Sequence, residues 1–155
     1  MISTERLFDI PYWQQKNFPT SKMFVSKING NWESISTSEF ILRAMEVSKG
    51  LISLGIQPGD KIAVASSNRV EWNILDIGVQ QVGAILVPVY PNISEADYRF
   101  IFNDAQVKIC FVSNLETLHN QTYTLCPAAQ AASQRRQDHF LATIIRRNIP
   151  ARLCD

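Results

Sequence analysis

Residues 54–66, with the sequence LGIQPGDKIAVAS, bring together the end of a helix, a turn and a buried strand. Gly55 is placed to end the helix in the left-handed conformation, which glycine accepts because it has no Cβ. Gln57-Pro58-Gly59-Asp60 is typical of a tight turn, since proline presets φ and glycine tolerates a positive φ. The run Lys61–Ser66 is short and almost wholly apolar, which predicts a strand covered on both faces.

The segment before this stretch predicts a hairpin and then a helix. Lys22–Ile28 and Trp32–Ile35 flank Asn29-Gly30, a dipeptide that tolerates the positive φ angles of a two-residue hairpin turn. Ser36 and Glu39 have capping-box spacing, in which each side chain satisfies a backbone amide of the first helical turn. The residues expected on the apolar side of this helix are Phe40, Ile41, Ala44, Met45 and Ile52. Those expected on its solvent-facing side are Glu39, Arg43, Glu46 and Ser53.

Two more helices and two more apolar runs follow. Asn68 is expected to cap the first helix, and Ser94 with Asp97 has capping-box spacing at the second. The apolar runs are Ala84–Tyr90 and Lys108–Ser113. The first helix has a polar stripe of Arg69, Asn73, Asp76 and Gln80, opposite Trp72, Leu75, Val79 and Val82, and the second presents Tyr98, Ile101, Phe102 and Ala105.

Short β-branched runs that alternate with helices predict a parallel sheet, because crossover helices cover its faces. The hairpin before the first helix is expected to be a separate antiparallel element. The predicted fold class is therefore α/β: an N-terminal hairpin followed by alternating helices and short parallel strands.

The composition limits the classes of protein to which this chain can belong. Of 155 residues, 46% are apolar and 19% are charged, which indicates a globular chain. A net charge of +1 gives no reason to expect nucleic acid or an acidic membrane surface as a partner. We do not expect the N-terminus to be a secretory signal, and the longest apolar stretch, Ala84–Val89, is far too short to span a membrane. Cys110, Cys126 and Cys154 are scattered, which favours a reducing compartment, and we expect a cytoplasmic protein.

The composition also changes along the chain. All six glycines lie at or before Gly83 and all lysines at or before Lys108, whereas five of the nine arginines follow Glu116. Periodicity fades at the same point. We therefore expect a body at residues 1–115 and an unassigned tail at 116–155. The tail is either out-of-frame or degenerate sequence, or an ordinary variable segment.

The order of these pieces resembles the N-terminal subdomain of the adenylate-forming superfamily, and most of all its long-chain fatty-acid–CoA ligase branch. The resemblance covers roughly residues 5–114, so the chain is expected to be a partial N-terminal subdomain of such an enzyme. The residues that carry it are Trp32 with Ser36–Phe40, Leu54–Ala63, Asn68–Trp72, Gly83–Pro91, and Tyr98 with Asn103–Ala105 and Lys108.

The resemblance implies a two-step reaction. A carboxylic acid attacks the α-phosphate of ATP to give an acyl-adenylate and pyrophosphate, and the thiol of CoA then takes the acyl group. The full-length family needs ATP, Mg²⁺ and CoA, a glycine-rich loop for the triphosphate and a lysine from a C-terminal domain, all downstream of the matched region. The chain has no glycine after Gly83 and no lysine after Lys108. We therefore expect an inactive fragment with no catalytic, cofactor-binding or metal-binding residue and no cofactor of its own.

Several side chains have both a structural and a functional interpretation. Ser66, Ser67 and Asn68 follow a strand and open a helix, where open α/β sheets bind ligands, but a helix N-cap with a polar turn is the favoured interpretation. Trp72 and Tyr90 would wall an acyl groove or pack within the core. We expect no acid/base pair from Asp60 and Glu71, and no role for His119 and His139, which lack metal-ligand spacing.

The tail contains one further pattern. Arg135-Arg136 and Arg146-Arg147 flank an apolar set of Phe140, Leu141, Ile144 and Ile145, which would form a basic amphipathic helix able to touch membrane or RNA. Such a pattern also arises by chance in an unselected tail, and we expect no nucleic-acid partner.

Two alternatives to an enzyme fragment remain open: a stand-alone α/β binding or interaction module, and a pseudogene product without function. Truncation would also expose apolar residues that the rest of an enzyme covers, and these predict self-association. Some residues of this surface are expected among Trp72, Phe100, Phe102, Ile109 and Phe111.

Overall fold

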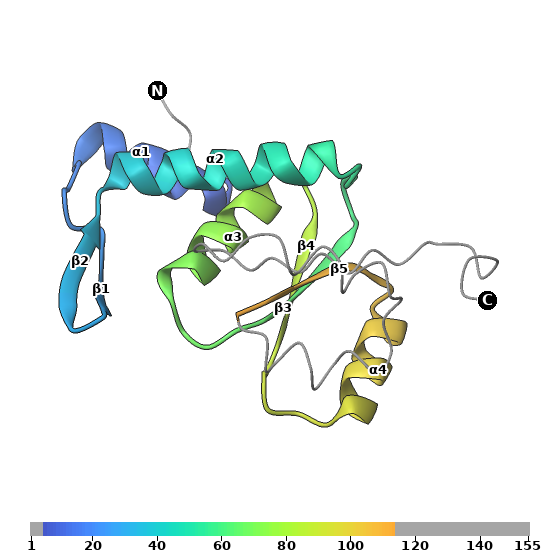
Figure 1. The fold of residues 1–155 in the computed structure, drawn as a ribbon. Helices are drawn as coiled ribbons and strands as arrows, with labels where there is room; N and C mark the ends of the chain where they lie inside the picture. Colours follow the sequence, from blue (N-terminus) through green and yellow to red (C-terminus); the bar gives the residue numbers. More distant parts are fainter. Residues whose placement is uncertain (1–4, 114–155) are drawn as a thin grey trace. The chain divides into compact units, whose positions relative to one another are not determined.

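The computed structural model describes residues 5–113, and this part of the chain forms two compact units (Figure 1). The first unit comprises the chain up to Gly59 together with Asn68–Ala84. The second unit comprises Asp60–Ser67 and the residues from Ile85 onward. The chain therefore passes from one unit to the other at residues 59–60, 67–68 and 84–85.

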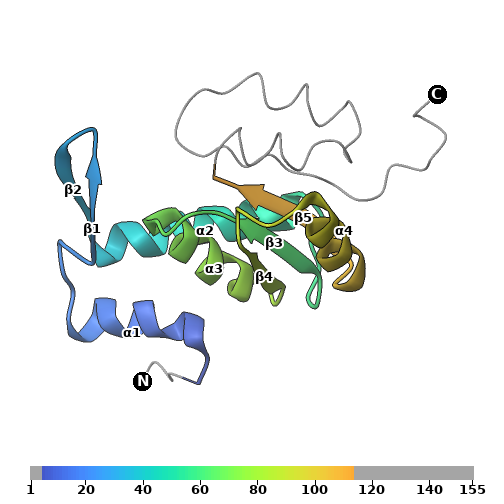
Figure 2. The ribbon, with the colours of Figure 1, turned by 90° about the horizontal axis from the view of Figure 1, so that it is seen from below.

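The first unit is a helical unit with a hairpin. Its elements are the 3₁₀ helix η1 (Leu7–Asp9), α1 (Ile10–Asn17), β1 (Phe24–Ile28), β2 (Asn31–Ile35), α2 (Thr37–Ser53) and α3 (Val70–Gln81). Helix α2 packs against both α1 and α3. Figure 2 shows the hairpin standing off the N-terminal end of α2.

The hairpin is formed as predicted. Strands β1 and β2 pair antiparallel, with Phe24 opposite Ile35 and Ile28 opposite Asn31. Asn29 and Gly30 both have positive φ, at 50° and 86°, which is the backbone of a type I′ turn. The ring of Phe24 stacks on Phe40 of α2 at a centroid distance of 5.3 Å, so one side of the hairpin joins the core of the first unit.

Helix α2 begins where the sequence predicts, although only half of the capping box forms. Ser36 accepts a hydrogen bond from the Glu39 amide at 3.2 Å, whereas the Glu39 carboxylate pairs with Arg43 one turn later. The predicted apolar side is wrong at two positions, since Met45 is 38% exposed and Ile52 is 62% exposed. Each lies one residue, or about 100° around the helix, beyond the buried stripe. That stripe consists of Thr37, Phe40, Ile41, Ala44, Ser48 and Leu51.

Helices α2 and α3 end in the same way. Gly55, with φ at 78°, donates to the Ile52 carbonyl, and Ile56 donates to the Leu51 carbonyl, which is the hydrogen-bond pair of a Schellman motif. Gly83, with φ at 73°, and Ala84 repeat the pattern at the end of α3. The prediction that Gly55 ends a helix in the left-handed conformation is therefore confirmed.

Helix α3 begins one residue later than predicted. Its N-cap is Arg69, which has an extended backbone and whose Nε donates to Glu71 Oε2 at 2.8 Å. The prediction that Asn68 caps this helix is wrong, because the N-cap position is taken by Arg69, the next residue along the chain.

The second unit is a parallel sheet with one helix. Its elements are β3 (Lys61–Ala65), β4 (Ile85–Val89), α4 (Glu95–Asp104) and β5 (Val107–Val112). The strand order is β4-β3-β5, and both pairs are parallel. The parallel arrangement and the α/β class are thus as the sequence predicts, with strand bounds shifted by about one residue.

Helix α4 has the predicted cap and the predicted apolar face. Ser94 and Asp97 form a complete capping box. Tyr98 is buried in a hydrophobic cluster with residues of the sheet, and Ile101, Phe102 and Ala105 pack against this cluster. The sheet residues of this cluster are Ala63, Ala65, Val89, Val107, Cys110 and Val112. This contact forms the core of the second unit.

Two of the five residues among which exposed ones were expected are buried. Ile109 is 1% exposed and Phe111 is 8% exposed, so neither belongs to the exposed surface. They alternate along β5 with Cys110 and Val112, and β5 is apolar on both faces, as buried parallel strands are. Phe100 is 69% exposed, as expected, whereas Trp72 and Phe102 are half-buried.

Candidate functional site

The carboxyl edge of the three-stranded sheet is the place where an open α/β sheet binds a ligand. Ala65 is in register with Val89 on one side and with Val112 on the other, so all three strands end at the same level. The residues that follow them are Ser66, Tyr90 and Ser113. We call this set, with Ser67, the sheet edge.

Hydrogen bonds within the sheet edge are directed at the backbone. Ser66 Oγ donates to the Ser67 carbonyl at 2.9 Å, and the Ser113 amide donates to the Ala65 carbonyl at 3.1 Å. The Tyr98 hydroxyl donates to the Tyr90 carbonyl at 2.8 Å and ties the loop after β4 to α4. The Tyr90 side chain is 78% exposed, so it does not pack in the core. The hydrogen bond from Ser66 to the backbone favours the structural interpretation.

The loop from β4 to α4 is unsuited to a triphosphate. A phosphate cradle needs flexible backbone whose amides point at one anion, together with a positive local field. All six glycines of the sequence belong to the first unit, so this loop contains none. Glu95 and Asp97 add negative charge in the first turn of α4, and Asp97 already accepts from the Ser94 amide at 3.3 Å. The described residues here do not fit the phosphates of ATP.

Asp60 and Glu71 each have a basic partner. The Asp60 carboxylate lies 2.7 Å from Lys108 Nζ in the second unit, and Glu71 accepts from Arg69 in the first. The basic side chains of the two pairs, Lys108 and Arg69, are 47% and 42% exposed, so solvent screens both contacts and they stabilise the fold only modestly.

Trp72 is half-buried in α3, and Asn68 is exposed just before that helix. Burial raises the pKa of the Cys110 thiol to about 12, so this cysteine does not supply a thiolate nucleophile near neutral pH. His119, His139 and the paired arginines of the tail lie outside the described residues.

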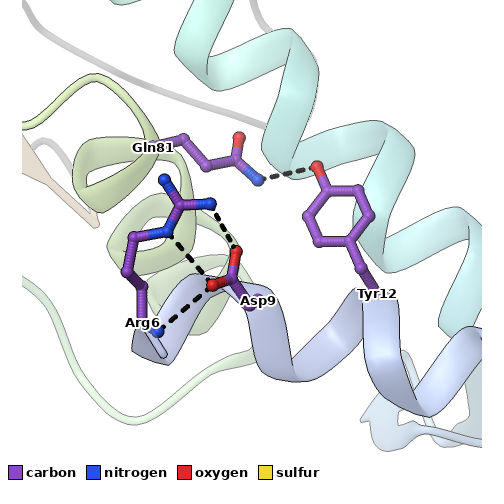
Figure 3. Close-up of polar contacts among 4 residues, drawn as sticks. All are labelled: Arg6, Asp9, Tyr12 and Gln81. Atoms are coloured by element: carbon purple, nitrogen blue, oxygen red, sulfur yellow. Dashed lines mark hydrogen bonds and ion pairs between the residues drawn. The ribbon is translucent and has the colours of Figure 1, made fainter. Parts of the chain in front are cut away.

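A polar network in the first unit was not predicted, and Figure 3 shows its contact between Gln81 and Tyr12. Ser48 Oγ lies 3.0 Å from the Gly78 carbonyl and 2.5 Å from Gln81 Oε1, and Gln81 Nε2 donates to the Tyr12 hydroxyl at 2.9 Å. The chain of contacts joins α1, α2 and α3. Ser48 lies one turn after Ala44 on the buried stripe of α2, and a polar residue on an apolar stripe is the sequence signal that points to such a network.

The same part of the unit holds a buried carboxylate. Asp9 is 8% exposed and accepts from the Arg6 backbone amide and from the guanidinium, with Arg6 Nη2 at 2.9 Å from Oδ1 (Figure 3). These hydrogen bonds lower the pKa of Asp9, against the opposing effect of burial. The arrangement locks the turn before α1.

The described part of the chain contains neither a cluster of metal ligands nor a membrane-spanning helix. Within residues 5–113, no three His, Cys, Asp or Glu side chains gather as metal ligands would. None of the helices in this range combines the length and apolar character that crossing a bilayer requires.

Comparisons with known proteins show which family and which proteins this chain is similar to. The sequence model described as AMP-binding enzyme matches residues 12–149, a range that continues past the body expected to end at residue 115. A long-chain-fatty-acid–CoA ligase of Mycobacterium bovis is 32% identical over 97 residues, which cover 63% of this chain and 16% of that protein.

A shorter relative matches as well. An uncharacterized protein of Mycobacterium tuberculosis is 29% identical over 80 residues, covering 52% of this chain and 46% of that one. Among solved structures, the fatty acid AMP ligase from Legionella pneumophila has a TM-score of 0.61 at 18% identity, covering 68% of this chain and 19% of that chain. This likeness establishes the fold.

Proposed function

Because this chain belongs to the family of AMP-binding enzymes, we propose that it is the N-terminal part of a long-chain fatty-acid–CoA ligase. The observation that carries the proposal is the 32% identity over 97 residues to the ligase of Mycobacterium bovis. The chain spans about a sixth of that relative's length. The fold supports the proposal, because it is similar to that of the fatty acid AMP ligase from Legionella pneumophila, with a TM-score of 0.61.

The proposed reaction uses ATP, Mg²⁺ and CoA. The fatty acid carboxylate attacks the α-phosphate and releases pyrophosphate, and the CoA thiol then displaces AMP. The loop between β4 and α4 does not fit the triphosphate, and a catalytic step needs donors aimed at the phosphate oxygens. We therefore propose that residues 1–155, taken alone, supply scaffold rather than catalysis.

The first prediction concerns activity. The purified chain is expected not to catalyse ATP–pyrophosphate exchange with any C8–C18 fatty acid, and titration of ATP in a calorimeter is expected to give no saturable heat. The ligase of Mycobacterium bovis, assayed in parallel, serves as the positive control. Exchange by this chain above the rate without fatty acid contradicts the scaffold role.

A second candidate function is a stand-alone interaction module in the cytoplasm. The observation that favours it is the uncharacterized Mycobacterium tuberculosis protein, of which the matched region already covers 46%. Exposed apolar residues such as Phe100 would then meet a partner or a second copy. Coding sequence after residue 155 that resumes the ligase pattern in any reading frame supports the enzyme fragment, and its absence supports the module. A sharp two-state melt of a monomer likewise favours the module.

A further inference from the structure

Helix α2 carries a second apolar stripe, which the fold leaves exposed. Leu42 and Ile52 are 55% and 62% exposed, and Met45 between them is 38% exposed. Lys49 lies in the same row and is also exposed. Each of the four follows directly after a residue of the buried stripe of α2, so the two stripes run side by side along the helix. We name Leu42, Met45, Lys49 and Ile52 the α2 seam.

The spacing of the α2 seam is that of a helix pair. Its residues follow one another at intervals of three, four and three, so Leu42 and Lys49 take the a positions of a heptad and Met45 and Ile52 take the d positions. Positions a and d face a second helix when two helices pack side by side at a shallow angle. The α2 seam therefore fits one further helix along about three turns.

Two charged side chains of α2 indicate which helix that is. Glu46 and Lys49 are exposed, and neither forms an ion pair among the described residues. By contrast, Glu39 and Arg43 of the same helix pair with each other. Helix α2 thus presents one carboxylate and one ammonium that a partner can match, and a second copy of α2 carries both.

An antiparallel second copy satisfies both the apolar and the charged positions. When a two-fold axis relates the two helices, Leu42 lies opposite Ile52 of the second copy and Met45 lies opposite Lys49 of the second copy. The aliphatic part of Lys49 then covers Met45, and its ammonium comes beside Glu46 of the other copy. A parallel pair would instead place Lys49 against Lys49, where like charges repel.

We propose that two copies of this chain associate through their α2 seams in this antiparallel arrangement. The contact is isologous, so each pairing occurs twice. A seam of about three turns is smaller than a standard protein interface, which makes the dimer weak and dependent on concentration. The proposal does not depend on the proposed reaction.

Sedimentation velocity of the full chain, from about 1 to about 300 μM, brackets a weak dimer and tests the contact. The wild-type chain is expected to shift from monomer to dimer over this range. The variant L42S/I52S is expected to weaken the dimer at least tenfold. The control variant L7S/F18S removes residues outside α2 that are 68% and 66% exposed, and it should change the dimer less than twofold. Circular dichroism checks that all variants keep the wild-type fold.

Two charge reversals test the orientation. Glu46→Lys and Lys49→Glu are each expected to weaken the dimer severalfold, because each places like charges across the contact. An equimolar mixture of the two variants is expected to form a heterodimer at least as tightly as the wild type, because every lysine then meets a glutamate of the other copy. A change confined to one helix would leave the mixture as monomeric as its components.

Four results overturn the proposal. The first is a wild-type chain that stays monomeric throughout the concentration range. The second is equal loss in L42S/I52S and L7S/F18S, which would move the contact away from α2. The third is a mixture of the charge variants that associates no better than either alone. The fourth is a Lys49→Glu variant that dimerises like the wild type, since in a parallel dimer like charges face each other with either residue.

Discussion

At the scale of single residues, Gly78 decides how closely α2 and α3 approach. A Cβ at this position would lie 2.6 Å from Val47 Cγ1 and 3.0 Å from the Ala44 carbonyl oxygen. Gly78→Ala is therefore expected to destabilise the fold by about 1–3 kcal/mol, because an overpacked helix contact must shift. Urea unfolding followed by circular dichroism measures the change.

Gly50 is the matched control for this substitution. It lies in α2 and a Cβ there would meet nothing within 4 Å. Gly50→Ala is expected to stabilise by up to about 1 kcal/mol, since alanine loses less conformational entropy in a helix. A stabilised Gly78→Ala variant would mean that the two helices do not pack as closely as the structure has them.

At the scale of elements, the start of α4 is stabilised by the capping box of Ser94 and Asp97. Ser94 accepts from the Asp97 amide at 3.2 Å and its own amide donates to Asp97. Ser94→Ala is expected to cost about 1 kcal/mol, as the loss of an N-cap does. Ser67→Ala, on the sheet edge, should change stability by less than about 0.5 kcal/mol. Thermal melts compare the two, and a larger loss from Ser67 would give that residue a role the sheet edge does not indicate.

Element types were predictable because strong local signals agreed. Asn29-Gly30 marked the hairpin, Ser94 with Asp97 marked a helix start, and Gly55 marked a helix end. The end of α4 gave no such signal. Gln106 takes a left-handed φ of 53° there, although it is not a glycine, and such a residue looks ordinary in the sequence.

The polar network and the Gly78 contact were harder to predict. Tyr12, Ser48 and Gln81 are far apart in the sequence and meet only when three helices pack. Periodicity predicts which side of a helix is apolar, but not which side the tertiary structure buries. Helix α1 demonstrates the difference, because Ile10 and Trp13 face outward while Tyr12 bonds to α3. The same limit explains why Met45 and Ile52 were misplaced.

At the scale of the whole molecule, we propose that residues 116–155 are a segment separate from the body. Limited proteolysis is then expected to cut first at Arg135–Arg136 or Arg146–Arg147, and further digestion with a protease of broad specificity to leave a product that ends near Asn114. Mass spectrometry identifies the products. Protection of these bonds, with earlier cuts in the body, would extend the folded region toward residue 149, where the match to the family ends.

The interleaving of the two units has a consequence for inheritance. Residues 60–67 belong to the second unit but lie between two stretches of the first, and residues 68–84 of the first lie between two stretches of the second. A recombination breakpoint anywhere between codons 60 and 84 would therefore split both units at once. Neither unit can be gained, lost or exchanged as one contiguous exon-like block. Gene shuffling of this region is expected to preserve it whole or to destroy it.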